Sequence, residues 1–380
     1  MTSADKRTGL SRFLFSGQGW PYLLVPLIPV AVALELAHAA APIIFFAAAA
    51  GVIPTAALMG RATEELAARS GPGIGGLLNV TFGNAPELII AFFALREGLQ
   101  EVVKASLVGS ILGNILLVMG AAMLIGGLTG GRSGAQQKFE SRAANAQSLL
   151  LMLALAALVM PAVYELVVGS GLPKPNTEAV DYHDDVKTIS AIVACILLFS
   201  YAGALVFSLK THRDLFNPVG EEEHHGEPWT VRRAVILLAI AGAAVGLMSE
   251  ILVGSISETA EKIGISEFFI GVIVVAIVGN AAEHSVAVYV ASKDKMDLAV
   301  NIAIGSSAQI ALFAAPVLVL LSFFIGDFPM PLVFNGFELA AIVLAILVAD
   351  RVTSEGESNW HEGLQLLCLY AVIGVTFYFA

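Results

Sequence analysis

Runs of about 20 mostly apolar residues, the length that a membrane-spanning helix needs, dominate this chain and constrain its fold more than any other feature. Only 13% of the 380 residues are charged, whereas a soluble domain usually carries about 25%. The runs are continuous rather than alternating, which favours helices over transmembrane strands. We therefore predict an all-α membrane protein with eleven transmembrane helices, near residues 21–38, 42–60, 73–95, 105–129, 147–168, 188–209, 232–254, 267–291, 298–325, 332–350 and 362–380.

The composition also narrows the choice of partners. Acidic residues outnumber basic ones by 31 to 20, so no polycationic surface is available for the phosphates of a nucleic acid. The two cysteines, Cys195 and Cys368, lie in apolar runs, which excludes a disulfide framework and a Cys-x-x-Cys metal site. We expect the lipid bilayer as the surroundings, no nucleic acid and no cofactor, and we leave open whether the protein forms a homo-oligomer.

The basic residues predict how the chain is oriented. If the N-terminus is cytoplasmic, 15 of the 20 basic residues fall on the cytoplasmic side. Eleven spans then place the C-terminus on the far side. The first apolar run, which ends in Ala37-His38-Ala39, also resembles a cleaved signal peptide, but its length and the spans that follow favour a retained helix.

Two short motifs occur twice with the same spacing. The pentapeptide GNAPE at residues 83–87 returns as GNAAE at 279–283, and GS at 109–110 returns at 305–306, each displaced by 196 positions. The copies fall in spans three and eight and in spans four and nine, so corresponding spans cross the membrane in opposite directions. Inverted repeats of this kind are typical of secondary transporters. The predicted layout is an N-terminal tail and extra helix (1–40), a first five-helix repeat (41–210), a cytoplasmic acidic loop (211–230) and a second five-helix repeat (231–380).

The repeated pentapeptide carries an ionisable residue at a depth where charge is costly. Glu87 and Glu283 lie in the middle of apolar segments, which makes them functional candidates. Asn84 and Asn280 precede them by three positions and share their helix faces. Two opposed segments would combine carboxylate and amide oxygens into a site with a formal charge of −2. Hard divalent cations prefer such ligands, and Ca²⁺ tolerates irregular geometry better than Mg²⁺ does.

Other residues of the repeat could complete this site. Glycines four positions before each glutamate, Gly83 and Gly279, loosen the helix. Ser110, Ser306 and Gln309 could add ligands or relay protons, or could be small polar helix contacts.

The two glutamates can also take up protons, because burial and mutual repulsion disfavour two charges. Protons and a divalent cation would then compete for the same oxygens, which together with alternating access suffices for cation/proton antiport. The alternative is that the glutamates only join helices by hydrogen bonds.

Acidic residues also gather between the halves. These acidic residues are Glu221, Glu222, Glu223 and Glu227. They could raise the local cation concentration at an entry path, or could belong to an ordinary solvated loop. Three further acids in apolar surroundings have no partner in the repeat and receive no predicted role: Glu35, Glu165 and Glu338.

Together these motifs resemble the cation/proton exchangers, the CAX branch of the calcium/cation antiporter superfamily. The resemblance extends to IGGLLN at 74–79, IAIGSSAQIA at 302–311 and ESNW at 357–360. It implies one extra helix plus two inverted five-helix repeats, and export of cytosolic Ca²⁺ in exchange for H⁺. It also implies that Glu87 and Glu283 bind Ca²⁺ and H⁺ alternately, and that the acidic segment assists Ca²⁺ entry.

The sequence leaves three alternatives to Ca²⁺/H⁺ exchange. A Na⁺/Ca²⁺ exchanger or another divalent cation/H⁺ antiporter would use a similar site. A membrane-embedded enzyme is disfavoured because the chain has no HExxH or GxSxG motif. The short N-terminal tail favours a bacterial plasma membrane protein, whereas a eukaryotic source would favour the vacuolar membrane.

Overall fold

The computed structural model describes residues 19–129, 136–175, 180–211, 229–326 and 328–380. These parts of the chain are mostly helical, which confirms the predicted fold class. Their strands are two residues long and form one antiparallel pair, in which β1 (Gln137–Lys138) lies beside β2 (Glu357–Ser358).

The helices of the first half follow the predicted apolar runs. Several runs are interrupted, and the elements in order are η1 (Trp20–Leu24), α2 (Leu27–Leu36), α3 (Ala41–Arg69), α4 (Gly71–Gly83), α5 (Ala85–Arg96), α6 (Gln100–Leu112), η2 (Gly113–Val118), α7 (Met119–Thr129), α8 (Ser141–Val167), α9 (Asp184–Val206) and η3 (Phe207–Thr211).

The second half begins at α11. Its elements in order are α11 (Val231–Gly254), α12 (Ile256–Ile263), α13 (Glu267–Phe269), η4 (Ile270–Val275), α14 (Ala276–Ala291), α15 (Met296–Gln309), η5 (Ile310–Ala314), α16 (Ala315–Ser322), α17 (Gly336–Thr353) and α18 (Trp360–Phe379). The starts of α6 and α15 are 196 positions apart, the displacement of the repeated motifs.

Among the described residues, eight helices are long and apolar enough to cross a membrane, or nine if the bent pair α4–α5 counts as one span. The predicted number of eleven is therefore not established by length and composition. The segment Trp20–Leu36 is shorter than a full span. Helix α17 has only 18 residues, and Glu338, Asp350 and Arg351 are among them.

Large apolar side chains lie on the outside of the bundle. Phe199, Phe324 and Phe379 are each more than 80% exposed. Apolar surface on this scale is costly in water but favourable against lipid chains. The helix surfaces thus agree with the composition in indicating a membrane environment.

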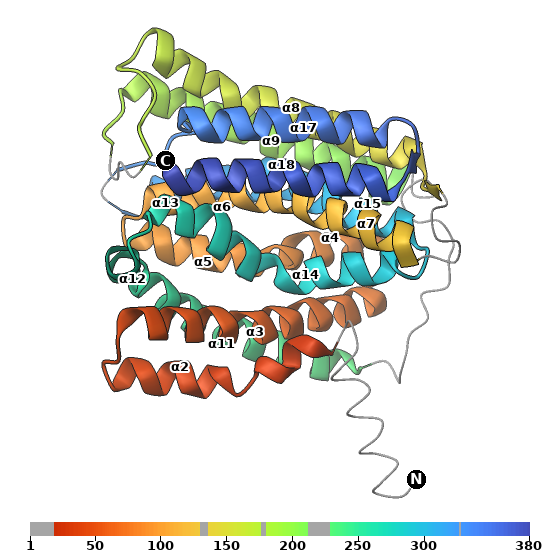
Figure 1. Ribbon diagram of the computed structural model, residues 1–380, viewed down its shortest axis with the longest axis horizontal. Helices are drawn as coiled ribbons and strands as arrows, with labels where there is room; N and C mark the ends of the chain where they lie inside the picture. The colour runs from red at the N-terminus through yellow and green to blue at the C-terminus, as the bar shows by residue number, and fades with distance from the viewer. Residues whose placement is uncertain (1–18, 130–135, 176–179, 212–228, 327) are drawn as a thin grey trace, which may run out of the picture.

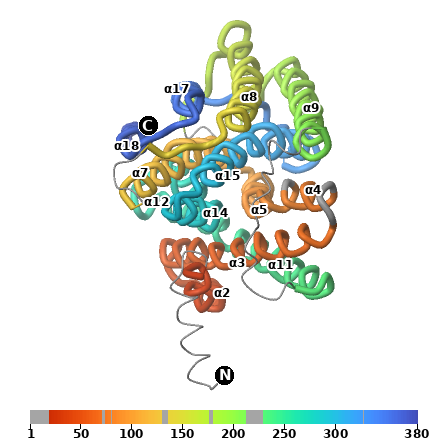
Figure 2. The backbone as a smooth tube through the Cα atoms, turned by 90° about the vertical axis from the view of Figure 1, so that its right-hand side faces the viewer, coloured from red at the N-terminus to blue at the C-terminus, as the bar shows by residue number. Residues whose placement is uncertain are grey.

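The helices lie roughly parallel to one another and stack in layers (Figures 1 and 2). Helix α2 packs on α3, and α3 pairs with α11. The next layer contains α5 and α14, which contact α11 and α3 respectively, and α6 and α15 lie beyond it. Helices α8, α9, α17 and α18 cover the opposite face (Figure 2). Both copies of the repeated pentapeptide therefore lie in the interior layers.

The two copies differ in local backbone. In the first copy the helix breaks at Asn84, and the axes of the two pieces differ by 42°. Pro86 explains this break, because its ring cannot continue the hydrogen-bond ladder of α4. The second copy has Ala282 at the matching position, and α14 runs through it without interruption.

Candidate functional site

The four residues of the repeated Asn and Glu pairs lie on adjacent interior elements. Asn84 joins α4 to α5, Glu87 is in the first turn of α5, and Asn280 and Glu283 are on α14. Both asparagines are fully buried, with 1% or less of their surface exposed. Buried amides and carboxylates at this depth need polar partners, and the structure provides them from the other half of the chain.

The two asparagines donate hydrogen bonds across the halves. Asn84 Nδ2 donates to Gln309 Oε1 of α15 at 2.5 Å. Asn280 Nδ2 donates to Ser110 Oγ of α6 at 3.0 Å and to the carbonyl oxygen of Ala276 at 2.9 Å. Each asparagine is thus held through its amide nitrogen by a residue of the opposite half, which orients the amide group.

The carboxylates occupy the space between these pairs. Glu283 Oε2 accepts a hydrogen bond from Ser306 Oγ at 2.8 Å. The side chain of Glu87 lies against Gly279, where an added Cβ would meet its Cγ at 3.3 Å. This close approach explains why glycine suits position 279. Gly83 similarly faces Gln309, whose Oε1 would lie 4.0 Å from an added Cβ.

A small cavity links Glu87 to the serine on α6. It is lined by Glu87, Ile90, Ser106, Leu107, Ser110, Val275 and Ile310. The structure therefore places all nine predicted binding residues on the neighbouring elements α4, α5, α6, α14 and α15 or at their junctions. Contacts join these residues in three groups: Gly83, Asn84 and Gln309; Glu87, Ser110, Gly279 and Asn280; and Glu283 and Ser306.

Three buried oxygens of the repeated Asn and Glu residues make no hydrogen bond to the described part of the chain. They are Asn84 Oδ1, Asn280 Oδ1 and Glu87 Oε2. All three are acceptors, so another acceptor cannot satisfy them. Leaving such atoms unpaired in a low-dielectric interior is costly, which points to a cation or protons as their natural partners.

The ligand chemistry of these residues is oxygen rather than nitrogen or sulfur. Within the described ranges no group of three or more His, Cys, Asp and Glu side chains is arranged so that it could hold a metal ion. A cation here would have two carboxylates supplemented by amide and hydroxyl oxygens. Flexible oxygen ligation of this kind suits Ca²⁺ better than Zn²⁺.

One neighbour of the site was not singled out from the sequence. His284 follows Glu283 directly, and its buried Nε2 has no partner among the described residues. The only available signal was its adjacency to a repeated glutamate. The predicted entry residues Glu221, Glu222, Glu223 and Glu227 lie outside the described residues.

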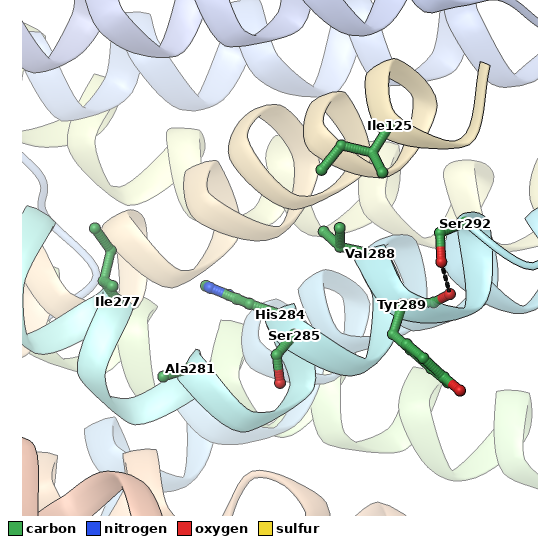
Figure 3. A pocket seen from close by; sticks show the side chains of 8 residues that line it. All are labelled: Ile125, Ile277, Ala281, His284, Ser285, Val288, Tyr289 and Ser292. Atoms are coloured by element: carbon green, nitrogen blue, oxygen red, sulfur yellow. Dashed lines mark hydrogen bonds between the residues drawn. The ribbon is translucent and has the colours of Figure 1, made fainter. Parts of the chain in front are cut away.

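A more open pocket lies elsewhere, along α14. It measures about 520 Å³ and is lined by Ile125, Ile277, Ala281, His284, Ser285, Val288, Tyr289 and Ser292. Figure 3 shows that Ile125 comes from α7, and the other residues lie on α14 except Ser292, which directly follows it. Neither Glu87 nor Glu283 lines it, so its size does not make it the ion site.

Comparison with known proteins gives consistent results. Residues 40–210 and 233–379 match the family described as "Sodium/calcium exchanger protein". The Ca(2+)/H(+) antiporter of Synechocystis sp. is 43% identical, covering 88% of this chain and 91% of its own. The Ca(2+)/H(+) antiporter ChaA of Bacillus subtilis is 44% identical, covering 92% and 96%. Among solved structures, the Ca2+/H+ antiporter protein YfkE superposes with a TM-score of 0.78 at 41% identity, covering 95% and 99%.

Proposed function

The chain belongs to the sodium/calcium exchanger protein family, among the relatives of Ca²⁺/H⁺ antiporters, and from this premise we propose that it exchanges Ca²⁺ for H⁺ across a membrane. It is a transporter rather than an enzyme. The relatives that carry the name Ca(2+)/H(+) antiporter align over nearly their whole length.

The observation that supports this proposal most strongly is the set of three unpartnered oxygens. Two of them belong to the asparagines and one to Glu87, and all three are buried. Glu283, the second carboxylate of the repeat, is held by Ser306. In the proposed mechanism these oxygens and the two carboxylates surround Ca²⁺ in one state. In the other state the carboxylates hold protons, because two buried charges without a counterion are strongly disfavoured.

The amide groups have a separate role in this mechanism. Their nitrogens are held by Gln309 and Ser110, so their oxygens keep a fixed direction whether or not the ion is bound. Ligands fixed in advance lose little freedom when the ion binds. Gln309 and Ser110 thus position ligands, and Ser306 holds Glu283.

For the whole chain we propose alternating access by two inverted repeats. The first would comprise residues 41–210, the second residues 231–380, and residues 1–40 would add one helix, giving eleven spans. The proposed orientation is a cytoplasmic N-terminus, with Ca²⁺ leaving the cytosol as H⁺ enters. Residues 211–230 would guide Ca²⁺ to the cytoplasmic entrance.

A transport assay in everted vesicles tests the proposed exchange. An imposed proton gradient should drive ⁴⁵Ca²⁺ uptake, and a protonophore should stop it. Uptake that follows a Na⁺ gradient and ignores the protonophore would instead identify a Na⁺/Ca²⁺ exchanger.

The same assay tests the two glutamates. Glu87→Gln and Glu283→Gln should each reduce uptake to the level of empty vesicles, because each removes a charge that binds Ca²⁺ and a group that carries H⁺. Glu35→Gln is the matched control, since Glu35 is exposed on α2 and should transport normally. Near-normal uptake by either of the first two variants, with normal expression, would remove that residue from the proposed site.

A further inference from the structure

A second cluster of buried charges lies where α6 begins, and the proposed transport site does not use it. Glu101 and Lys104, in the first two turns of α6, form an ion pair, and they are 1% and 3% exposed. Lys104 Nζ also donates to the carbonyl oxygen of Val333 at 3.1 Å, in the segment that leads into α17. This lysine therefore ties α6 to a segment more than 200 residues away in the chain.

Helix α17 contributes a second carboxyl group to the cluster. Glu338 is 0% exposed, and its Oε2 accepts a hydrogen bond from the backbone nitrogen of Asn335 at 2.9 Å. Its Oε1 is buried without a hydrogen-bond partner among the described residues. Glu338 and Lys104 are close enough to interact electrostatically. The Lys104 ammonium is thus the positive charge beside the buried carboxyl groups of Glu101 and Glu338.

Tyr182, which precedes α9, completes the cluster. It is 5% exposed and interacts electrostatically with Lys104, Glu101 and Glu338. Burial raises the pKa of the Tyr182 hydroxyl, so this group keeps its proton at neutral pH and can donate a hydrogen bond. Buried charges that lose a partner are strongly destabilised, which makes the arrangement sensitive to loss of the lysine.

The cluster lies on the opposite side of α6 from the ion site. Ser106 and Ser110 are four positions apart, and both line the cavity beside Glu87. At about 100° per residue, Lys104 lies roughly 200° around the helix from Ser106. One face of α6 thus contacts the ion site while the other is fixed to α17.

The corresponding helix of the second half has different chemistry at the same place. Asp297 and Val300 on α15 are 196 positions after Glu101 and Lys104. Asp297 is exposed and accepts a hydrogen bond from the backbone nitrogen of Glu140, at the start of α8. Val300 is buried and apolar. Helix α15 packs on α8, and α6 packs on α17. The contact between α6 and α17 contains the buried charge cluster, whereas the contact at the start of α15 contains the exposed hydrogen bond of Asp297.

We propose that Lys104 is a positioning residue for transport, which through its hydrogen bond to Val333 and its charge beside Glu101 and Glu338 fixes the start of α6 to the segment that leads into α17, and keeps that end of the ion site closed at rest. The proposal rests on alternating access by the two halves. Because the described residues at the matching contact of Asp297 include no buried ion pair, we expect the resting protein to favour opening at the opposite end, where α15 begins. Conformational exchange then requires the Lys104 contact to loosen.

Accessibility of a single cysteine from each side of the membrane tests the proposal. The parent protein has Cys195 and Cys368 replaced by alanine and Ile90, in the wall of the cavity, replaced by cysteine. Labelling rates with a membrane-impermeant maleimide are compared in right-side-out and everted vesicles. Lys104→Gln should raise labelling from the α6 end about tenfold and lower it from the other end, as expected for a shifted two-state equilibrium.

Three further variants make the result specific. Lys104→Arg should restore the parent pattern because it keeps the charge. Asp297→Asn, at the matching position of α15, should not raise labelling from the α6 end. If Lys104→Gln is not folded, judged by size-exclusion chromatography, the double variant Glu101→Gln/Lys104→Gln removes both members of the ion pair and should show the same shift.

The outcomes separate this proposal from the proposed function. Equal labelling of folded Lys104→Gln and parent from both ends would overturn the role of Lys104, as would an equal increase from both ends, which indicates general loosening. If the protein of native sequence shows no proton-driven ⁴⁵Ca²⁺ uptake while the labelling of the cysteine parent still differs between the two ends, the exchange is contradicted and the positioning role stays intact.

Discussion

At the scale of single residues, the amide groups of the two asparagines explain how a neutral side chain can serve a cation site. Asn280 uses its nitrogen on Ser110 Oγ and on its own helix, which leaves Oδ1 unpaired toward the interior. The serine therefore matters less as a ligand than as the group that holds the amide in one orientation.

A double-mutant cycle tests this role of Ser110. Ser110→Ala should weaken apparent Ca²⁺ affinity about 3–10-fold, the usual cost of losing one buried hydrogen bond. Asn280→Ala should weaken it more, and the double variant should be no worse than Asn280→Ala, because the serine acts through the asparagine. Thr63→Ala is the control, since that buried hydroxyl bonds only to Met59 of its own helix. Independent, additive losses at Ser110 and Asn280 would show that the serine acts by another route.

The sequence predicted the identity of these residues but not their partners. Asn84 and Glu87 were found because each recurs 196 positions later. The bond from Asn84 to Gln309 joins residues 225 positions apart, and no local pattern specifies which polar group of α15 meets which amide. From the sequence Lys104 is only a basic residue next to the apolar run 105–129, because its burial depends on the segment before α17 folding over it.

At the scale of elements, the two copies of the repeated pentapeptide differ in backbone, because the helix breaks between α4 and α5 in the first copy and continues in the second. Asn84 lies at the junction, whereas Asn280 lies inside a continuous α14. The sequence indicated this difference through Pro86, but the continuous course of α14 through Asn280 required the structure. The π-helical segments η2, η4 and η5 were likewise not predicted, because no residue pattern in them distinguishes them from α-helix.

Replacing the proline tests whether the bend serves the site. Pro86→Ala would allow α4 and α5 to join into a straighter helix, which would move Asn84 relative to Glu87. We expect proton-driven Ca²⁺ uptake to fall at least tenfold, with thermal stability of the purified protein changed little, because a misplaced ligand costs far more in function than in folding. Pro161→Ala, inside α8, should keep normal uptake. Normal uptake by Pro86→Ala would show that the bend is not needed.

At the scale of the whole molecule, the outer pair α3–α11 is joined at one end by a single aromatic residue. Trp229 lies between the guanidinium groups of Arg61 and Arg233, at 5.1 and 4.7 Å from its ring centre, and its backbone nitrogen donates to Glu65. Cation–π contacts of this kind stabilise partly buried sites. Trp229 lies near the end of the predicted loop 211–230, so this end of the loop lies where α3 and α11 meet.

The interior layers bring the two halves together at one set of carboxylates and amides. Our central claim is that Ca²⁺ and H⁺ compete there, because Glu87 and Glu283 cannot hold both at once. Lowering the pH protonates the carboxylates and should therefore weaken Ca²⁺ binding, while raising the pH should strengthen it.

The most direct test is Ca²⁺ binding to the purified protein as a function of pH. Between about pH 8 and pH 6, the apparent Kd should rise as the pH falls, approaching about a hundredfold per unit where two protons are displaced, and the double variant Glu87→Gln/Glu283→Gln should not bind. A Kd that is independent of pH, or binding that persists in the double variant, would contradict the account.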